Sequence, residues 1–447
     1  MKDSSSLSAS PTKRSTVRHT RAIQRDRSKR PIVTAPDPVV ADRLTELIHP
    51  HTLSQVAHYH DLGLRERILT LPVMVALVLS MIWRQIGSVS TLLHLLREEG
   101  FLWTSPVEVS EQALSLRLRV FPAALFRDVF LSLLPALQER ERVRQRPLPP
   151  ELAWAKEHFS AVLAADGSTL DALLRQVGLL KDRPDTPLAG RITALLDLGA
   201  RLPRQVWYEA EALAHDQRHW PQILQAVPHG ALLLVDLGYT NFTLFLQMTR
   251  DQITFVTRAK VNLVYQVERV LHETSHARDR LVWIGQDATR QQVRLIEVLV
   301  GTSWHRYLTN ELNPARLPPE YAVALYGQRW RIEDAFLAVK RLLGLAYFWV
   351  GSANGVELQI WATWLLYAVL VDLTDAIAEE LGQPFAALSL EMVYRSLYFF
   401  TSAYQRGEAT HPVVYLAQKA DRLGILKKRG PPKSRLRDLA LTFAQGP

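Results

Sequence analysis

The chain has 447 residues, of which 48% are hydrophobic and 22% are charged, and these proportions exclude a wholly disordered or fibrous protein. Its length exceeds that of one typical domain, so we expect two or three. Because it contains no cysteine, a disulfide framework, a thiolate zinc site and a cysteine nucleophile are all excluded.

The formal net charge of +9 is concentrated at the two ends of the chain. Residues 1–30 hold nine Lys and Arg against two Asp, and residues 421–447 hold seven against two, whereas the segment between them is slightly acidic. Basic arms of this kind suit binding to a phosphate backbone, because each neutralised phosphate releases condensed counterions. A solubilising, disordered tail explains the same pattern.

Residues 39–146 show apolar side chains at helical spacing and little β-type alternation, which predicts an all-helical N-terminal domain. Within it, Ser110 is placed to cap a helix that is followed, after a proline, by a second helix. Such a pair could enter a major groove, with Arg117 and Arg119 facing DNA. A helical hairpin with surface arginines is the alternative interpretation.

Two apolar stretches, residues 68–83 and 358–371, are shorter than the roughly 20 residues that span a bilayer, so we expect buried helices there. The first 30 residues also lack the apolar segment of a signal peptide. We therefore expect neither a secretory nor a membrane protein.

The pattern changes near residue 155, where short apolar runs bounded by turn residues begin. These runs predict strands over residues 161–165, 191–198, 205–210, 230–235 and 253–260. A helix is expected over residues 215–226, and three strands, a helix and a strand form the start of a mixed α/β sheet. Residues 261–310 predict a β-rich insertion, and one long helix is expected over residues 318–345.

Asp166 and Asp236 each directly follow an apolar run that predicts a strand, and a glycine follows each within two residues. In an open sheet two such strand ends can be neighbours, with both side chains in the crevice outside the sheet. Two converging carboxylates repel each other unless they share a proton or hold a hard metal ion. Alternatively, either aspartate caps a turn.

Tyr326, Arg329, Glu333 and Lys340 lie three, four and seven residues apart, a spacing that places them on one face of a single helix. Glu333 would complete a carboxylate triad around metal, while Arg329 and Lys340 hold phosphate oxygens and Tyr326 donates a hydrogen bond or stacks. A solvated helix face with internal ion pairs is the alternative.

This Tyr–Arg–Glu–Lys spacing resembles the signature of the DDE transposases of the insertion-sequence-four type, bacterial mobile-element enzymes with a ribonuclease H-like catalytic core. The stretch Asp166–Thr169 (DGST) and the apolar run before Asp236 match the surroundings of the two aspartates in that family. The similarity covers about residues 60–375. We therefore expect an α/β protein with a ribonuclease H-like mixed sheet flanked by helices.

The resemblance implies two Mg²⁺ or Mn²⁺ ions in each active site, held by Asp166, Asp236 and Glu333. The tyrosine, arginine and lysine of the signature would contact the transposon end near its cleaved phosphodiester. Relatives also stack an aromatic residue of the insertion on a flipped base, a role for which Trp304 is a candidate. A tryptophan in a strand more commonly packs in a core.

The leading hypothesis is a DNA transposase that cleaves transposon ends and joins them to target DNA through a hairpin intermediate. A structure-selective nuclease and an inactive DNA-binding repressor are the alternatives. Expected partners are double-stranded DNA of the element ends and target, and a second copy of the chain on DNA. No nucleotide cofactor is expected, since no glycine-rich phosphate loop is present. The resemblance also implies a cytoplasmic protein associated with the bacterial nucleoid.

Four histidines between residues 49 and 60 match no zinc-binding spacing and are interpreted as part of a helix start. The expected organisation, in chain order, is a basic arm (1–38), a helical N-terminal domain (39–146), the first part of the catalytic core (155–260), the β-rich insertion (261–310), the second part of the core with the Glu helix (311–378), and a helical C-terminal region with a basic tail (379–447).

Overall fold

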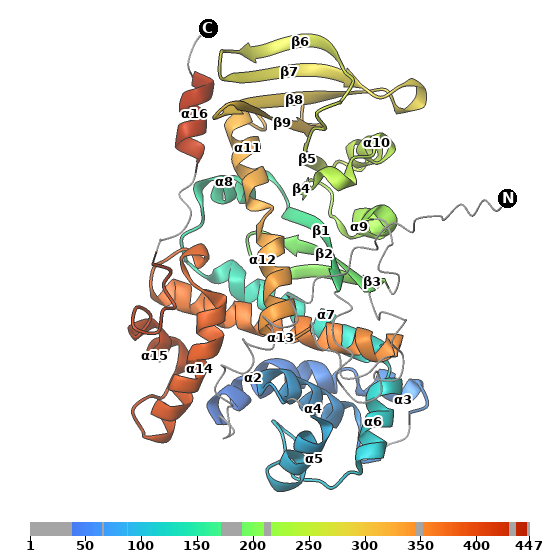
Figure 1. Cartoon of the computed structure of the whole chain (residues 1–447), viewed down its shortest axis with the longest axis vertical. Coiled ribbons are helices and arrows are strands. Elements are labelled where there is room, and N and C mark those ends of the chain that lie inside the picture. Colours follow the sequence, from blue (N-terminus) through green and yellow to red (C-terminus); the bar gives the residue numbers. More distant parts are fainter. Residues whose placement is uncertain are drawn as a thin grey trace, which may run out of the picture.

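The computed structural model describes residues 38–64, 67–86, 88–170, 190–209, 216–345, 352–428 and 435–444. Residues 1–37 of the predicted basic arm (1–38) and part of the basic C-terminal tail lie outside these ranges. The molecule is elongated, with N-terminal helices at one end, a large sheet at the other, and two long helices between them (Figure 1).

The N-terminal region is all-helical, as predicted. Its helices are α2 (Pro38–Leu53), α3 (Val56–Asp61), α4 (Leu71–Trp83), α5 (Val89–Glu98), α6 (Glu111–Val120), α7 (Ala123–Val143) and α8 (Pro150–His158). The predicted cap of α6 is present, because the hydroxyl of Ser110 accepts a hydrogen bond from the Ala113 amide at 3.2 Å. The interpretation of the four histidines as a helix start is wrong, because they lie in the second half of α2 and within the short α3. Among the described residues no group of three His, Asp or Glu side chains forms a metal site.

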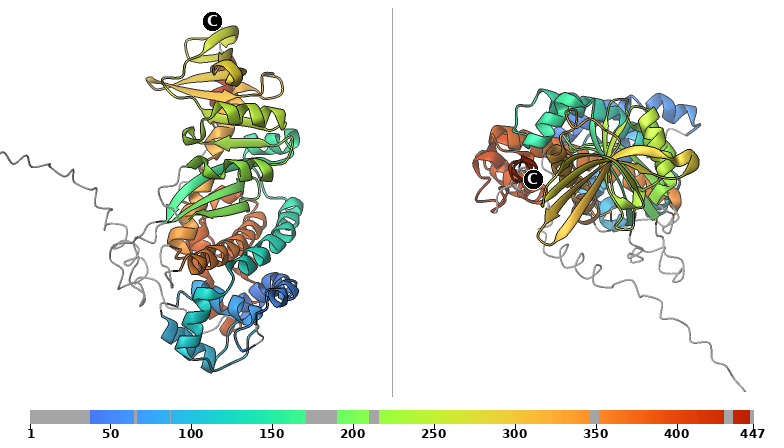
Figure 2. Two further views of the ribbon diagram at one scale, coloured as in Figure 1. Left: turned by 90° about the vertical axis from the view of Figure 1, so that its right-hand side faces the viewer. Right: turned by 90° about the horizontal axis from the view of Figure 1, so that it is seen from above.

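Helix α13 (Ala353–Glu380) is the central helix of the protein. It packs beside α7 between the sheet and the N-terminal helices (Figures 1 and 2). By length and composition α13 could cross a membrane, but 94% of its most apolar window is buried inside the protein. Both apolar stretches therefore belong to buried helices, as predicted: residues 358–371 lie in α13, and the other stretch forms α4.

Ion pairs join α13 to α7 and the segment that follows it. Asp372 of α13 accepts hydrogen bonds from Arg144 at 2.7 Å and from Arg140 and Arg43 at 3.1 Å each. Asp375, one turn later, is bound by Arg144 and Arg146. Both acids are almost fully buried, so their arginines supply the charge that burial requires.

A single mixed sheet of nine strands follows, which confirms the predicted mixed α/β class. The order across the sheet is β3-β2-β1-β4-β5-β9-β8-β7-β6. The strands are β1 (Val162–Leu170), β2 (Gly190–Asp197), β3 (Pro203–Glu209), β4 (Leu232–Val235), β5 (Thr254–Arg258), β6 (Gln266–Glu273), β7 (Ala277–Ile284), β8 (Gln291–Val300) and β9 (Ser303–Thr309). Strands β1, β4 and β5 are parallel neighbours, and the other pairs are antiparallel.

Alternate residues of the parallel strands enter two separate cores, because successive side chains of a strand point to opposite faces. On one face, Leu163 and Leu233 pack with α9 (Trp220–Ala226) and α10 (Phe242–Arg250). On the other face, Ala164 and Leu234 join the core that contains the helices α7, α11 (Pro319–Gln328), α12 (Arg331–Leu337) and α13. These central strands are therefore buried on both sides.

The β-rich segment after β5 extends the same sheet rather than folding on its own. Strand β9 pairs with β5, with Val256 opposite Thr309, and β8, β7 and β6 follow outward. At the buried centre of this extension, Arg294 binds Asp279 through two hydrogen bonds and donates a third to the Leu317 carbonyl.

The predicted single helix over residues 318–345 is wrong. The chain forms α11 (Pro319–Gln328), a turn at residues 329–330, α12 (Arg331–Leu337) and a π-helical segment, η5 (Ala338–Leu342). Around the turn, Arg329 bonds back to Tyr326 and Glu333 to Trp330 in the tighter i to i−3 pattern, both at 3.1 Å. Gly327 weakens the helix just before this point.

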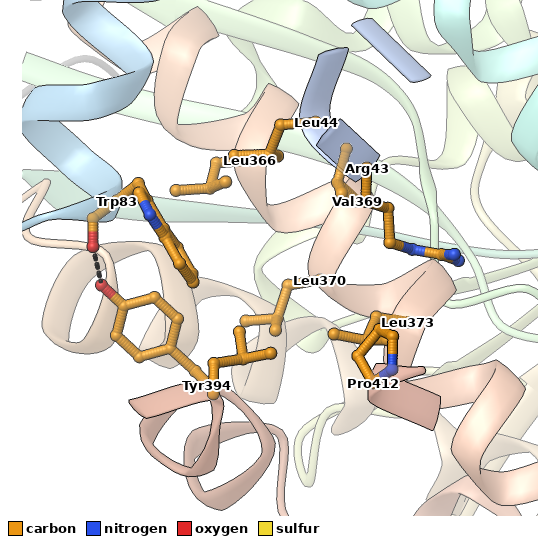
Figure 3. A pocket seen from close by; sticks show the side chains of 10 residues that line it. Arg43, Leu44, Trp83, Leu366, Val369, Leu370, Leu373, Tyr394 and Pro412 are labelled. Carbon is orange, nitrogen blue, oxygen red and sulfur yellow. Dashed lines mark hydrogen bonds between the residues drawn. The ribbon is translucent and has the colours of Figure 1, made fainter. Parts of the chain in front are cut away.

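The C-terminal part of the protein adds α14 (Leu390–Gln405), α15 (Pro412–Gln418) and α16 (Leu436–Ala444), the last of which packs on α11. Between α2, α4, α13, α14 and α15 lies an apolar cavity of about 30 Å³, too small for an organic ligand (Figure 3). At its edge the hydroxyl of Tyr394 donates a hydrogen bond to the Trp83 carbonyl at 2.8 Å.

Candidate active site

The backbone places Asp166 and Asp236 at the same level of the sheet. In the parallel pairing of β1 with β4, Ala165 lies opposite Val235, and each aspartate is the next residue along its chain. Val235 is the last residue of β4, and Asp236 begins the turn that leads into η3 (Leu237–Tyr239). The prediction that Asp166 follows its strand is wrong, because β1 continues to Leu170 and Asp166 pairs with Ala194 of β2. The two carboxylates nevertheless lie side by side at the level where β4 ends.

Helix α12 brings the third carboxylate beside them. The helix packs against β1, and its residues Ile332, Ala335 and Phe336 are buried in the core between the sheet and α13. This packing fixes the rotation of α12, and Glu333 lies on its partly exposed side. The break before α12 determines where Arg329 lies.

The guanidinium of Arg329 contacts all three carboxylates. It lies 2.7 Å from Asp166, 3.1 Å from Glu333 and 3.9 Å from Asp236, measured between nitrogen and carboxylate oxygen. Tyr326 adds a weak hydrogen bond from its hydroxyl to Asp236 at 3.4 Å. Three acidic residues that are far apart in the sequence therefore converge on one cationic group. We name the three residues Asp166, Asp236 and Glu333 the carboxylate cluster.

The pKa values reflect this crowding. Burial raises the pKa of Asp166, Arg329 and the Gly167 amide oppose that rise, and the negative charges of Asp236 and Glu333 add to it. Burial alone would lower the pKa of Arg329, but Tyr326 and the three carboxylates raise it instead. The cluster thus holds a permanently charged guanidinium among carboxylates that repel one another.

The donor set of the carboxylate cluster suits a hard divalent cation, because it offers only carboxylate oxygens. In the described part of the chain, however, no three acidic or histidine side chains form a group already arranged around a metal position. The guanidinium of Arg329 lies between the carboxylates instead. The residues therefore fit Mg²⁺ or Mn²⁺ chemically once Arg329 leaves the cluster.

Lys340, the last residue of the Tyr–Arg–Glu–Lys spacing, lies in η5, and its side chain extends to the C-terminal end of β1. Its ammonium group donates hydrogen bonds to the Ser168 hydroxyl and the Thr169 carbonyl, both at 2.5 Å. It therefore lies beside the strand that carries Asp166. All four residues of the signature gather at one edge of the sheet despite the break in the helix.

Trp304 lies in β9, in the outer part of the sheet, where it pairs with Leu299 of β8. The guanidinium of Arg278 covers one face of its ring, 4.3 Å from the ring centre. A base could stack on the opposite face of the Trp304 ring, and this role stays a prediction. Trp330, which was not expected at the site, is 60% exposed, and its ring centre lies 5.4 Å from the Arg329 guanidinium. The pattern Arg-Trp-Arg around the helix break was the only signal for it.

Arg117 and Arg119 lie on α6, in the N-terminal region. The guanidinium of Arg117 bonds to the Leu69 carbonyl and the Tyr59 hydroxyl and lies over the Phe121 ring, so it serves the fold of this region. Arg119 is exposed. DNA contact by this helix pair, whose two helices meet at a bend of 68°, stays a prediction.

Two comparisons with known proteins bear on this arrangement. Residues 189–369 match the family model described as "Transposase DDE domain", a range that includes Asp236 and Glu333 and begins after Asp166. Over 154 residues the chain is 28% identical to "Putative transposase y4zB" of Sinorhizobium fredii, which covers 32% of this chain and 43% of that protein. The chain thus spans less than half the length of this relative. Residues 189–369 are therefore similar to the transposase DDE domain, and the activity of the whole protein is a matter for proposal.

Proposed function

We propose that the protein is a DNA transposase that cuts transposon ends and joins them to target DNA. The observation that carries the proposal is the carboxylate cluster: Asp166 from within β1, Asp236 from the end of the adjacent β4 and Glu333 from α12 meet at a single cation. The match to the DDE domain supports it. The Tyr–Arg–Glu–Lys spacing supports assignment to the insertion-sequence-four type.

In this proposal the three carboxylates hold two Mg²⁺ or Mn²⁺ ions, with Asp166 and Asp236 around one and Glu333 completing the second. Bound divalent ions lower the pKa of water to make a nucleophile at neutral pH and stabilise the leaving 3′ oxygen. The role of the cluster itself is to supply the negative charge that concentrates both ions at one phosphodiester. No covalent bond between protein and DNA is required.

Arg329 has two partners in the proposed cycle. Without DNA it neutralises the carboxylates, and with DNA and metal it turns to a phosphate oxygen, which a guanidinium can bind through two parallel hydrogen bonds. Lys340 and Tyr326 would hold the DNA on either side, one by charge and the other through its hydroxyl. The freed 3′ hydroxyl then attacks either the opposite strand, which gives a hairpin, or target DNA.

Pairing of two transposon ends would bring two copies of the chain together on DNA, and we propose a homodimer in that complex.

The two alternative functions each lack a step of transposition. A structure-selective nuclease would cut but never join strands, whereas a repressor would bind DNA without cutting. Retention of all three carboxylates in one cluster favours a catalytic role.

The test uses the full chain and a labelled duplex taken from either flank of its own coding sequence. We expect a nick or hairpin with Mg²⁺ but not with Ca²⁺, and joining of a pre-cut end to a second duplex. The variant Asp236→Asn should lose nicking by at least about a hundredfold, since it weakens the binding of the metal ions. It should still bind DNA.

Asp287→Asn is the matched control, because Asp287 is exposed on a turn with φ of 46°, a conformation that asparagine tolerates. It should nick like the wild type. Nicking by Asp236→Asn at the wild-type rate would refute the assignment of the cluster. Cutting without joining would favour the nuclease.

A further inference from the structure

A polar pocket, separate from the carboxylate cluster, lies on the side of α12 that faces α14. It has a volume of about 280 Å³ and is bounded by α12, the start of α14 and the η6 turn (Phe385–Ala387). Figure 1 shows α12 with β1 and β2 to one side and α14 to the other. The charged residues of its lining are Arg201, Arg331, Asp334, Arg341, Glu391 and Lys427.

The lining has more positive than negative charge. Four of its six charged residues are basic, and one of the two acids, Glu391, already pairs with Arg395 outside the lining at 2.5 Å. The other acid, Asp334, is exposed and, among the described residues, forms no ion pair with Arg201 or Arg331, although its charge opposes the lowering of their pKa values by burial. Within the described ranges these two arginines therefore have no carboxylate in direct contact.

Buried arginines elsewhere in the protein show that this imbalance is unusual. Six arginines are buried in the described ranges. Four of them bind a carboxylate of the protein, as Arg84 with Glu99, Arg146 with Asp375, Arg294 with Asp279, and Arg329 with the carboxylate cluster. The two that bind no carboxylate among the described residues are Arg201 and Arg331, and both line this one pocket.

The contacts of these two arginines leave hydrogen-bonding capacity unused. Arg331 donates to the Leu198 carbonyl at 2.8 Å and is 8% exposed. Arg201 is 9% exposed, lies over the Phe385 ring at 4.5 Å, and its Nε has no hydrogen-bond partner among the described residues. Burial lowers the pKa of Arg201 to about 10. Burying a charge without a counter-ion is costly, so two such arginines in one pocket favour the binding of an anion there.

We propose that this pocket binds a phosphate group. Two guanidinium groups can each present parallel donors to its oxygens, and Lys427 at the rim adds a third charge. The phosphate comes either from the backbone of bound DNA or from a free phosphate ion. Because Arg331 and Glu333 belong to the same short helix, occupancy of the pocket stabilises the element that completes the carboxylate cluster.

The test measures thermal unfolding of the full chain in phosphate and in sodium chloride of equal ionic strength, without DNA or divalent metal. Phosphate should raise the unfolding midpoint of the wild type beyond the effect of chloride. In Arg201→Gln and Arg331→Gln the phosphate concentration for half of this shift should rise by at least about tenfold. Arg142→Gln, which removes an exposed arginine elsewhere, should keep the wild-type value.

If both buried substitutions prevent folding, Lys427→Gln decides the matter, because Lys427 is exposed and, among the described residues, its ammonium group bonds only to the Ala386 carbonyl. A rise of about threefold or more in its half-shift concentration supports the pocket. No extra stabilisation of the wild type by phosphate would overturn the proposal, as would equal shifts in the wild type, the pocket variants and Arg142→Gln.

A second measurement separates the two sources of the phosphate. If the source is DNA, Lys427→Gln should bind DNA more weakly than Arg142→Gln does, and the slope of log affinity against log salt should fall by about one. If the source is a free ion, the two variants should bind DNA equally, while only Lys427→Gln should need more phosphate to reach half of the shift. Since neither measurement involves cleavage, failure of the nicking assay is a separate result.

Discussion

At the scale of single residues, Arg329 is the most informative side chain of the protein. It is buried, and its single guanidinium group contacts three carboxylates. A cation in this position offsets the repulsion among acids that a metal would otherwise have to relieve. The cluster can therefore form in a folded protein that has bound neither metal nor DNA.

This role predicts a pH-dependent effect of Arg329→Gln. At pH 7 the variant should lose roughly 1–2 kcal/mol of unfolding free energy, since three partly buried carboxylates lose their cation. Burial already raises the pKa of Asp166 above its ordinary 3.8, and loss of Arg329 raises it further. The native variant then binds more protons than the native wild type, so the difference should shrink as the pH falls from 7 towards 4.

Urea titrations of both proteins at several pH values would check this prediction. Arg316→Gln is the control, because Arg316 pairs with Glu311 on the surface, and it should change stability by less than about 0.5 kcal/mol. A difference that grows as the pH falls would contradict the proposed neutralising role of Arg329.

At the scale of elements, the contact between α13 and the end of α7 depends on charge as well as on apolar packing. Asp372→Asn should cost about 3–5 kcal/mol, because it leaves Arg144 with a weaker partner in a buried position. Glu379→Gln, which alters an exposed acid 3.9 Å from the same arginine, should cost less than about 1 kcal/mol. Unfolding in urea measures both, and similar values for the two variants would contradict the prediction.

The sequence predicted the central strands of the sheet but not the break in the helix that carries Arg329 and Glu333. Strands β1 and β4 were located because each begins as a short apolar run before an Asp, but β1 continues to Leu170, five residues beyond the predicted end at residue 165. The break at residues 329–330 was missed, since the helical spacing continues through it and the contacts of Arg329 with the carboxylates form only in the folded protein. Periodicity records which side of a helix is apolar, not where tertiary contacts interrupt it.

The same limit applies to the pairing of strands. The sequence predicted strands after β5 but not that β9 would return to pair with β5 and make one continuous sheet. Such pairing joins residues about 50 positions apart and leaves no local pattern. The convergence of Asp166, Asp236 and Glu333 was expected from apolar runs and helix spacing, which need no knowledge of the order of strands. Their catalytic role stays a prediction.

At the scale of the whole molecule, charge is distributed unevenly between a slightly acidic body and basic ends. If the basic arm contacts DNA, removal of residues 1–37 should weaken DNA binding and reduce its dependence on salt, by roughly 0.9 in the slope for each phosphate that the arm would otherwise neutralise. Affinities measured over a range of salt concentrations check this. An unchanged slope would instead support a purely solubilising arm.

The parallel pairing of β1 with β4 also determines which changes the active site can survive. The aspartates owe their alignment to backbone register, so substitutions around them leave both carboxylates side by side. Loss of one residue inside β4 would differ in kind: it would move Asp236 by about 3.3 Å along the strand and turn its side chain to the opposite face. Evolution can therefore vary the loops between these strands far more freely than the length of the strands themselves.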